Sequence, residues 1–173
     1  MSEQRPRYRM MTLAEIRARH QSSDPQPPRR LTGAELEDLR ARLNRGEHPR
    51  GEAEHNARYE LGIIRYVEAV DDLISRVHAQ ALDAAPDSTS RQYAAGILDA
   101  IAWARGELPT GPVTNRRPAT ALPGTQDLEG EAAAAARVLR GQERAARELS
   151  TSYVSGVEAT LLWALCSAPD PWT

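Results

Sequence analysis

Few residues of this chain combine the type and spacing that catalysis or metal binding requires. Glu52 and His55 are three residues apart, as in helical di-iron sites, but those sites need a second such pair and further carboxylates on facing helices. Only this pair occurs, and its carboxylate fits the start of a helix, where it complements the helix dipole. The single cysteine, Cys166, follows an apolar stretch, so we expect a buried, unreactive thiol.

A second cluster of acidic residues contains Glu68, Asp71 and Asp72. Two pairs of carboxylates on one helix can together hold Mg²⁺. Here no other carboxylate pair precedes the cluster on the same helix, so we interpret it as a solvated acidic face. The sequence also lacks a nucleophile elbow and a glycine-rich phosphate loop. We therefore predict a non-enzymatic protein without metal or cofactor. A carboxylate–metal enzyme is the third functional hypothesis.

All 22 basic residues are arginine, which fits either codon bias or selection for binding phosphate and carboxylate groups. The net charge of −2 excludes a polycation, yet residues 1–58 hold 12 arginines and 9 acidic residues. Arginine can neutralise phosphates and tyrosine can stack on bases, so the alternative function is a nucleic-acid-associated accessory or regulatory protein. The candidate contacts are Arg5, Arg7, Tyr8, Arg9, Arg29, Arg30, Arg116 and Arg117.

One aromatic and glycine pattern recurs sixty residues later with the same spacing. On a helix its tyrosine, glycine and tryptophan lie roughly along one face, where the glycine lets another backbone approach. We interpret it as a helix-packing device, produced either by duplication or by a shared packing demand. A shorter echo, Tyr59-x-x-Gly62, lacks the tryptophan. The members are Tyr93, Gly96 and Trp103 in one copy, and Tyr153, Gly156 and Trp163 in the other.

Two helices are predicted between residue 31 and the first copy of this pattern. Thr32 and Glu35 form a capping box that begins a short amphipathic helix, which needs a surface to lie on. Apolar residues at heptad-like spacing then predict a helix from about residue 52 to residue 85. Its packing or interface seam includes Ile63, Val67, Val70 and Ile74.

The remaining helices carry the two copies of the repeated pattern. Asp87 or Ser88 caps a helix that ends near Gly106. From residue 128 to residue 163 the spacing of apolar residues by three and four continues unbroken. This favours one long, continuous or kinked C-terminal helix of about 40 residues and ~60 Å. The alternative is a break in which residues 150–152 end one helix and cap the next.

Together these patterns predict an all-α protein, a bundle of three to four helices with a long C-terminal helix. Residues 1–30 form a flexible Arg/Pro-rich basic arm with a short helix, and residues 31–173 form a helical domain interrupted by a Pro/Gly-rich loop at 109–126. An apolar seam that is longer than the neighbouring short helices can cover must pack against another chain. We therefore expect a protein-interaction or adaptor module that forms a homo-oligomer or binds another helical protein.

The sequence also indicates the cellular compartment of the protein. The chain shows no signal peptide and no apolar stretch long enough for a membrane span, and it has one cysteine. We therefore expect a cytoplasmic protein without a membrane partner.

Overall fold

The computed structural model describes residues 29–81, 84–85, 87–120 and 122–172, and every regular element in that part is a helix. The predicted all-helical class is confirmed, while residues 1–28, including Arg5, Arg7, Tyr8 and Arg9, lie outside the described residues. The elements are α2 (Gly33–Asn44), α3 (Gly51–Ala57), the 3-10 helix η1 (Arg58–Glu60), α4 (Val67–Ala81), α5 (Thr89–Ala104), α6 (Thr125–Leu139) and α7 (Thr151–Ala164).

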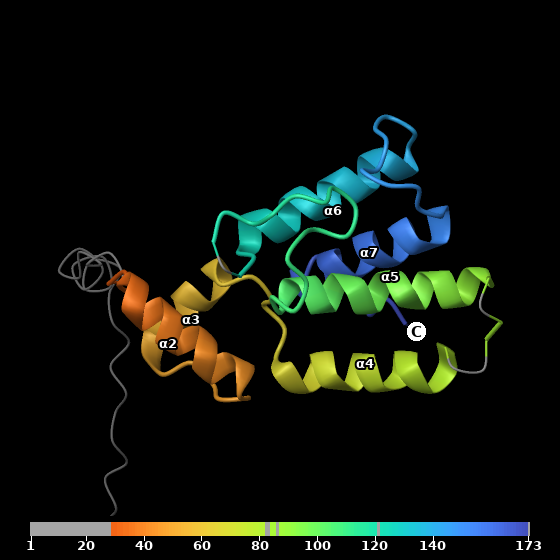
Figure 1. The fold of residues 1–173 in the computed structure, drawn as a ribbon. Helices are drawn as coiled ribbons and strands as arrows, with labels where there is room; N and C mark the ends of the chain where they lie inside the picture. Colours follow the sequence, from red (N-terminus) through yellow and green to blue (C-terminus); the bar gives the residue numbers. More distant parts are fainter. Residues whose placement is uncertain (1–28, 82–83, 86, 121, 173) are drawn as a thin grey trace, which may run out of the picture.

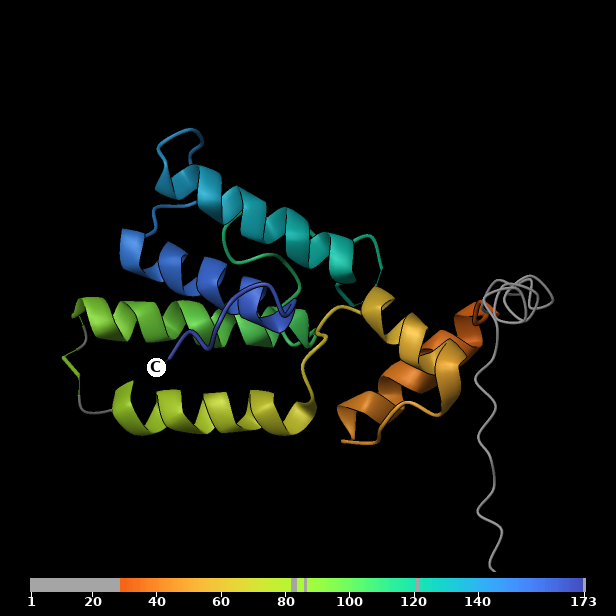
Figure 2. The ribbon, with the colours of Figure 1, turned by 180° about the vertical axis from the view of Figure 1, so that it is seen from behind.

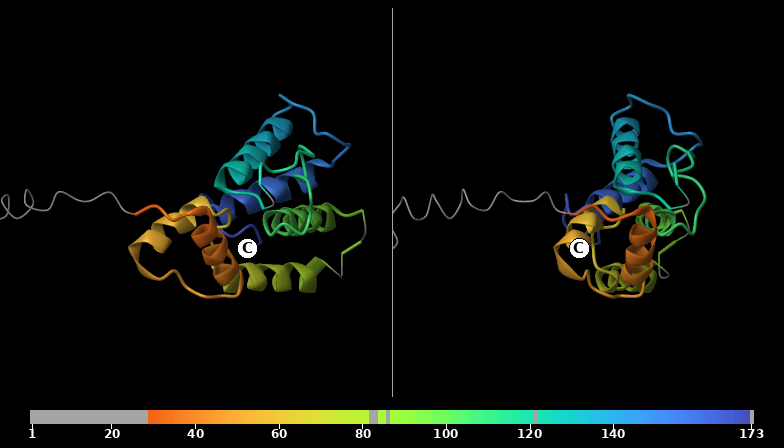
Figure 3. Two further views of the ribbon diagram at one scale, coloured as in Figure 1. Left: turned by 60° about the vertical axis from the view of Figure 1, so that its left-hand side comes forward. Right: turned by 90° about the vertical axis from the view of Figure 1, so that its left-hand side faces the viewer.

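Four of these helices stack in the order α6, α7, α5, α4, with α2 and α3 at one end of the stack (Figures 1 and 3). Helices α5 and α7 run in the same direction, and each follows a helix of opposite direction (Figures 1 and 2). The chain thus forms two helical hairpins whose second helices pack together. Their shared core contains fully buried Ile97, Leu128, Val157 and Leu161.

The central contact of the fold is the crossing of α5 and α7 at two glycines. A Cβ atom built on Gly96 would lie 2.1 Å from the backbone oxygen of Tyr153. A Cβ atom on Gly156 would lie 2.3 Å from the backbone oxygen of Tyr93. Each glycine therefore faces the tyrosine carbonyl of the other helix, and the two backbones touch where any larger residue would separate them.

The two copies of the repeated pattern also end their helices in the same way. The Gly106 N–H donates to the Trp103 carbonyl at 2.8 Å, and the Cys166 N–H donates to the Trp163 carbonyl at 2.9 Å. Gly106 and Cys166 both have positive φ, 79° and 58°. The tryptophans are buried, but Cys166 is exposed. The predicted buried thiol is wrong, because Cys166 lies two residues beyond the end of α7, where the chain turns at a positive φ and leaves this side chain exposed.

The predicted long C-terminal helix is wrong, because α6 ends at Leu139 and α7 begins at Thr151. Gly141, at φ 69°, turns the chain after α6, and the Ser150 side chain accepts a hydrogen bond from the N–H of Tyr153 at the start of α7. The number of residues between α6 and α7, from 140 to 150, equals that of about three helical turns at ~3.6 residues per turn. The apolar spacing therefore resumes in phase after the break, and the stripe looks continuous in the sequence.

The predicted helix over residues 52–85 is also wrong, because it is three separate elements. Gly62 has φ 94° and lies where a Cβ would be 2.7 Å from the Pro123 carbonyl oxygen, so the chain turns there instead of continuing as a helix. The third echo of the repeated pattern, at Tyr59 and Gly62, consequently forms no helix crossing. Ile63 lies in the connection to α4, where it packs against the core as a partly buried side chain.

The apolar face of α4 is covered largely within this chain. Val70, Leu73 and Val77 are 3%, 0% and 0% exposed, and Ile74 is partly buried against the same core. Val67 is half-buried in the first turn. The apolar seam from which we predicted a second chain is therefore covered by α5 and its neighbours. It gives no reason to expect self-association.

The connection between α5 and α6 is held by a buried carboxylate. Glu131 is 3% exposed, and its side chain accepts hydrogen bonds from the Val113 N–H at 2.6 Å, the Thr114 N–H at 3.0 Å and the Thr114 hydroxyl at 2.6 Å. Residues 111–113 are buried, so this part of the 109–126 loop belongs to the core although its composition is polar. The side chain of Glu131 thus orders a segment that lacks regular structure.

The segment after α7 folds back over α4 and α5. The Arg76 guanidinium donates to the Asp170 carboxylate at 2.6 Å and to the Trp172 carbonyl at 2.9 Å. The Trp172 ring stacks on Tyr93, with 6.0 Å between ring centroids, and its indole N–H donates to Gln80 at 2.6 Å. Trp172 thus joins α4 to α5.

The ion pair in this segment predicts a pH-dependent stability. Partial burial raises the pKa of Asp170, but hydrogen bonds from Arg76 and from the Trp172 N–H, with the charge of Arg76, leave that pKa below its usual value. A carboxyl group whose pKa is lower in the folded than in the unfolded state stabilises the fold above the unfolded pKa of about 3.9. This contribution to stability is lost as the pH falls through the pKa of the folded state. We expect Asp170→Asn to cost about 1 kcal/mol at neutral pH, because the pair is partly exposed.

Urea unfolding of both proteins across the pH range checks this expectation. The difference between wild type and Asp170→Asn should shrink as the pH falls below about 3.9 and through the depressed pKa of the folded carboxyl. Asp87→Asn, at an exposed position before α5, is the matched control and should show no such difference. A gap between wild type and Asp170→Asn that is unchanged at low pH would contradict the assigned role of the carboxylate.

Candidate functional site

The acidic residues considered for metal binding lie on exposed helix surfaces. Asp71 and Asp72 are exposed on α4, and Asp71 accepts a hydrogen bond from Arg105 at 3.1 Å. Glu52 and His55 are exposed on α3. Across the described ranges, no group of three or more His, Cys, Asp or Glu side chains is placed to hold a metal ion.

The arginines considered for nucleic-acid binding are exposed where the structure describes them. Arg29 and Arg30 precede α2, and the Arg29 guanidinium pairs with Glu35. Arg116 and Arg117 lie in the connection between α5 and α6. The two arginine pairs thus lie on separate segments of the chain, one before α2 and the other between α5 and α6.

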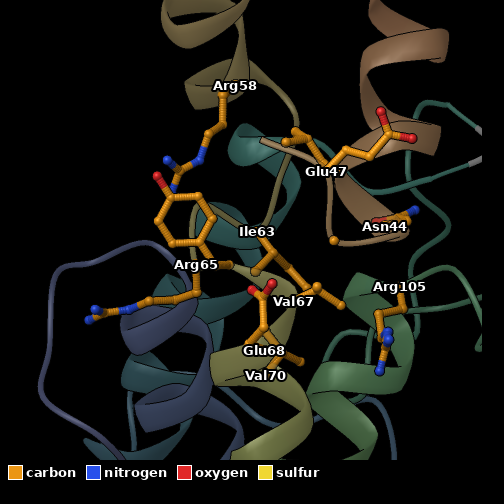
Figure 4. A pocket seen from close by; sticks show the side chains of 12 residues that line it. Asn44, Glu47, Arg58, Ile63, Arg65, Val67, Glu68, Val70 and Arg105 are labelled. Carbon is orange, nitrogen blue, oxygen red and sulfur yellow. The ribbon is translucent and has the colours of Figure 1, made fainter. Parts of the chain in front are cut away.

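A small cavity of about 50 Å³ lies where α2, η1 and the start of α4 meet, and Figure 4 shows the arginines around it. Arg58 donates to the Ile64 carbonyl and lies 4.3 Å from the centroid of the Tyr66 ring. Arg65 donates to the Trp163 carbonyl at 2.9 Å. Arg58 thus holds η1 to the connection before α4, and Arg65 holds that connection to the end of α7. The arginines have structural roles here, and the cavity between them has room for only a few water molecules.

A second polar cluster surrounds the hydroxyl of Tyr153. This hydroxyl donates to the Asp99 carboxylate at 2.6 Å and accepts from Arg147 at 3.1 Å. Burial raises the pKa of Tyr153, the Asp99 carboxylate raises it further, and Arg147 only partly opposes the rise. The phenol stays protonated at neutral pH and therefore does not act as a base, and its hydrogen bond to Asp99 fixes α7 to α5.

A much larger hollow, a groove of about 1020 Å³, lies between α2, η1 and the start of α6, and we call it the acidic groove. One wall is the face of α2 around Leu36 and Ala41. The other walls are η1 with Leu61, and residues from 119–120 and 122–129, which include the first turn of α6. Tyr59, at the edge of η1, is 49% exposed. The groove thus has apolar side chains from three separate segments of the chain.

Three polar contacts hold these walls together. Arg40 of α2 donates to the Pro123 carbonyl at 2.7 Å. The Thr125 hydroxyl donates to the Tyr59 carbonyl at 2.6 Å and accepts from the Gly62 N–H at 3.3 Å. Burial lowers the pKa of the Arg40 guanidinium, and the charge of Asp127 opposes that shift. The groove is therefore a preformed surface with fixed walls, and Arg40 is already engaged with one of them.

The charges around the acidic groove are unbalanced. Four carboxylates and one guanidinium line it, and that guanidinium belongs to Arg40. The Asp127 carboxylate accepts from the Gly124 N–H at 2.9 Å at the start of α6. An apolar surface surrounded by carboxylates attracts a ligand that is apolar on one side and cationic at its edges. The carboxylates are Glu37, Glu60, Asp127 and Glu129.

Sequence reasoning did not find this groove, because its acids come from α2, η1 and α6 and form no motif. One signal pointed toward it, namely the amphipathic helix begun by Thr32 and Glu35, whose reciprocal capping bonds are present. Leu39 of that helix is fully buried, whereas Leu36 is half-exposed and lines the groove. The helix thus lies on a surface, as expected, but leaves part of its apolar side available.

Comparison of the chain with protein-family models, with curated proteins and with solved structures found no match. Among the described helices, none has both the length and the apolar character that crossing a membrane demands. The acidic groove is consequently the feature on which a functional assignment rests.

Proposed function

We propose that this chain is a non-enzymatic protein-interaction module whose acidic groove binds an amphipathic, basic segment of a partner protein. The observation that supports the proposal is the combination of an apolar groove of about 1020 Å³ with four surrounding carboxylates. Grooves of this kind bind peptides by burying apolar side chains, while charge at the edge sets orientation and specificity. The helical bundle of α4 to α7 serves as the scaffold that holds one wall.

The same charges disfavour the alternative of nucleic-acid binding at this groove. Phosphates would approach Glu37, Glu60 and Glu129 and be repelled, because like charges brought together at an interface cost several kcal/mol. A nucleic-acid partner would have to use the exposed Arg116 and Arg117 or the basic N-terminal residues instead. The proposal therefore favours a protein partner, either a second copy of this chain or another helical protein.

Photo-crosslinking in the native host tests the proposal. A photoreactive amino acid replaces Tyr59 at the edge of the groove, and in a parallel protein it replaces Gln142, which is exposed beyond α6. We expect a discrete crosslinked protein from position 59 and none from position 142. Reversing two groove charges, Glu37→Arg with Glu129→Arg, should reduce the product at least about tenfold, equivalent to ~1.4 kcal/mol of binding free energy.

The matched control reverses two exposed acids outside the groove, Glu52→Arg with Glu148→Arg, and should leave the crosslink intact. The mass of the product separates a second copy of this chain from another protein. Products that disappear after nuclease treatment would instead indicate nucleic acid. Equal loss in the groove variant and in the control variant would contradict a specific role for the groove.

A further inference from the structure

The acidic groove requires a ligand with apolar side chains and positive charge, and the chain itself contains such a segment. Residues 5–20 contain five arginines and one acidic residue. The same stretch also contains Tyr8, Met10, Met11, Leu13 and Ile16. The charge of this segment is thus opposite to that of the groove, and its apolar side chains match the groove's apolar walls.

We propose that residues 5–20 occupy the acidic groove of their own chain and compete there with the partner. This inference rests on the proposed function of the groove and adds its regulation. A segment bound in this way excludes a second basic segment from the same walls. Partner binding would then require release of residues 5–20, so the apparent affinity for the partner is reduced by the occupied fraction.

The length of chain between the segment and the groove permits this contact. Residues 20 to 29 span at most about 30 Å when fully extended at ~3.3 Å per residue. The groove residues of α2 nearest to residue 29 are Leu36 and Glu37, and those farther along include Ala41. From Gly33 to Ala41 the helix rises only about 12 Å at ~1.5 Å per residue. The groove therefore lies well within reach of the same chain.

The short connection also favours the segment of the same chain over that of a second copy. A tethered segment experiences an effective concentration in the millimolar range when the connecting chain spans the distance without strain. Free copies of this chain at micromolar concentration compete poorly with that value. Even a weak contact, with an intrinsic dissociation constant near ~1 mM, would fill the groove for about half of the time.

The test uses the full chain with a photoreactive amino acid in place of Leu13. Unlabelled and nitrogen-15-labelled proteins are mixed before irradiation, so that crosslinks within one chain are distinguished by mass from those between copies. We expect crosslinks within one chain to α2 or to residues 119–129. Glu37→Arg with Glu129→Arg should reduce them at least about tenfold, and adding Arg17→Glu with Arg19→Glu should restore them, because opposite charges face each other again.

Each outcome decides between occupants. Crosslinks within one chain that are lost and then restored by the charge exchange support the inference. Crosslinks to the groove of the other copy would overturn it in favour of exchange between two chains. Absence of any crosslink from position 13 to the groove would also overturn it. If position 13 gives no crosslink but position 59 still crosslinks to a partner, only this inference is overturned and the proposed function stands. If neither position gives a crosslink, the inference and the proposed function are both overturned.

Discussion

Replacing Gly96 with alanine is expected to destabilise the protein by about 3 kcal/mol, a fall of roughly 6–12 °C in melting temperature for a chain of this size. The added Cβ would lie 2.1 Å from the Tyr153 backbone oxygen and 3.1 Å from the Val157 backbone nitrogen. Neither atom belongs to a side chain that could rotate away. The two helices would have to separate, and the buried residues around the crossing would lose contact.

Gly130 provides the matched control for this substitution. It also lies inside a helix, α6, but a Cβ built there meets nothing within 4 Å. Gly130→Ala should therefore raise stability by up to about 1 kcal/mol, because alanine favours a helix more than glycine does. Thermal unfolding followed by circular dichroism checks both changes, and a Gly96→Ala protein as stable as wild type would contradict the backbone contact.

Glu131→Ala is expected to lower stability by about 3 kcal/mol, because it leaves the N–H groups of Val113 and Thr114 without their acceptor. The Val113 N–H is 2.6 Å from the Glu131 carboxylate in the buried part of the 109–126 loop. Glu131→Gln keeps one carbonyl oxygen and should cost less. Hydrogen exchange gives a local measurement, in which the amides of residues 113 and 114 should exchange faster in both variants.

The control for this prediction is Glu129→Ala, an exposed position on the same helix, which should change stability by less than about 0.5 kcal/mol. A double-mutant cycle with Thr114→Val isolates the contact of the Thr114 hydroxyl with Glu131, at 2.6 Å. Additive effects in that cycle, together with unchanged exchange at residue 113, would mean that Glu131 does not order the loop.

Local signals in the sequence predicted several helix boundaries well. Thr32 begins α2 and Ser88 begins α5 through side-chain caps formed with residues three positions ahead, so the relevant physics lies within one turn. Ser150 does the same for α7. The break before Ser150 could not be predicted from periodicity, because the apolar spacing on the two sides of it stays in phase. Periodicity alone does not distinguish a continuous helix from two helices separated by a length equal to about three turns.

Contacts between distant segments were beyond sequence reasoning. Gly62 turns the chain away from a helix where it meets Pro123, and neither residue indicates the other in the sequence. The acidic groove has the same origin, because Glu37 and Glu129 face one hollow only after α2 and α6 have been placed. The repeated glycines indicated a close helix contact, but the pairing of α5 with α7 is a property of the tertiary structure.

The crossing of α5 and α7 also sets an order of events during synthesis. Gly156 follows Gly96 by sixty residues, so at ~5–20 residues per second the ribosome delivers the second helix about 3–12 s after the first. Throughout that interval the glycine face of α5 lacks its partner. The α5 of a neighbouring nascent chain carries the same tyrosine, glycine and tryptophan spacing as α7. Pairing between the α5 helices of two nascent chains would therefore compete with native pairing when closely spaced ribosomes translate one message.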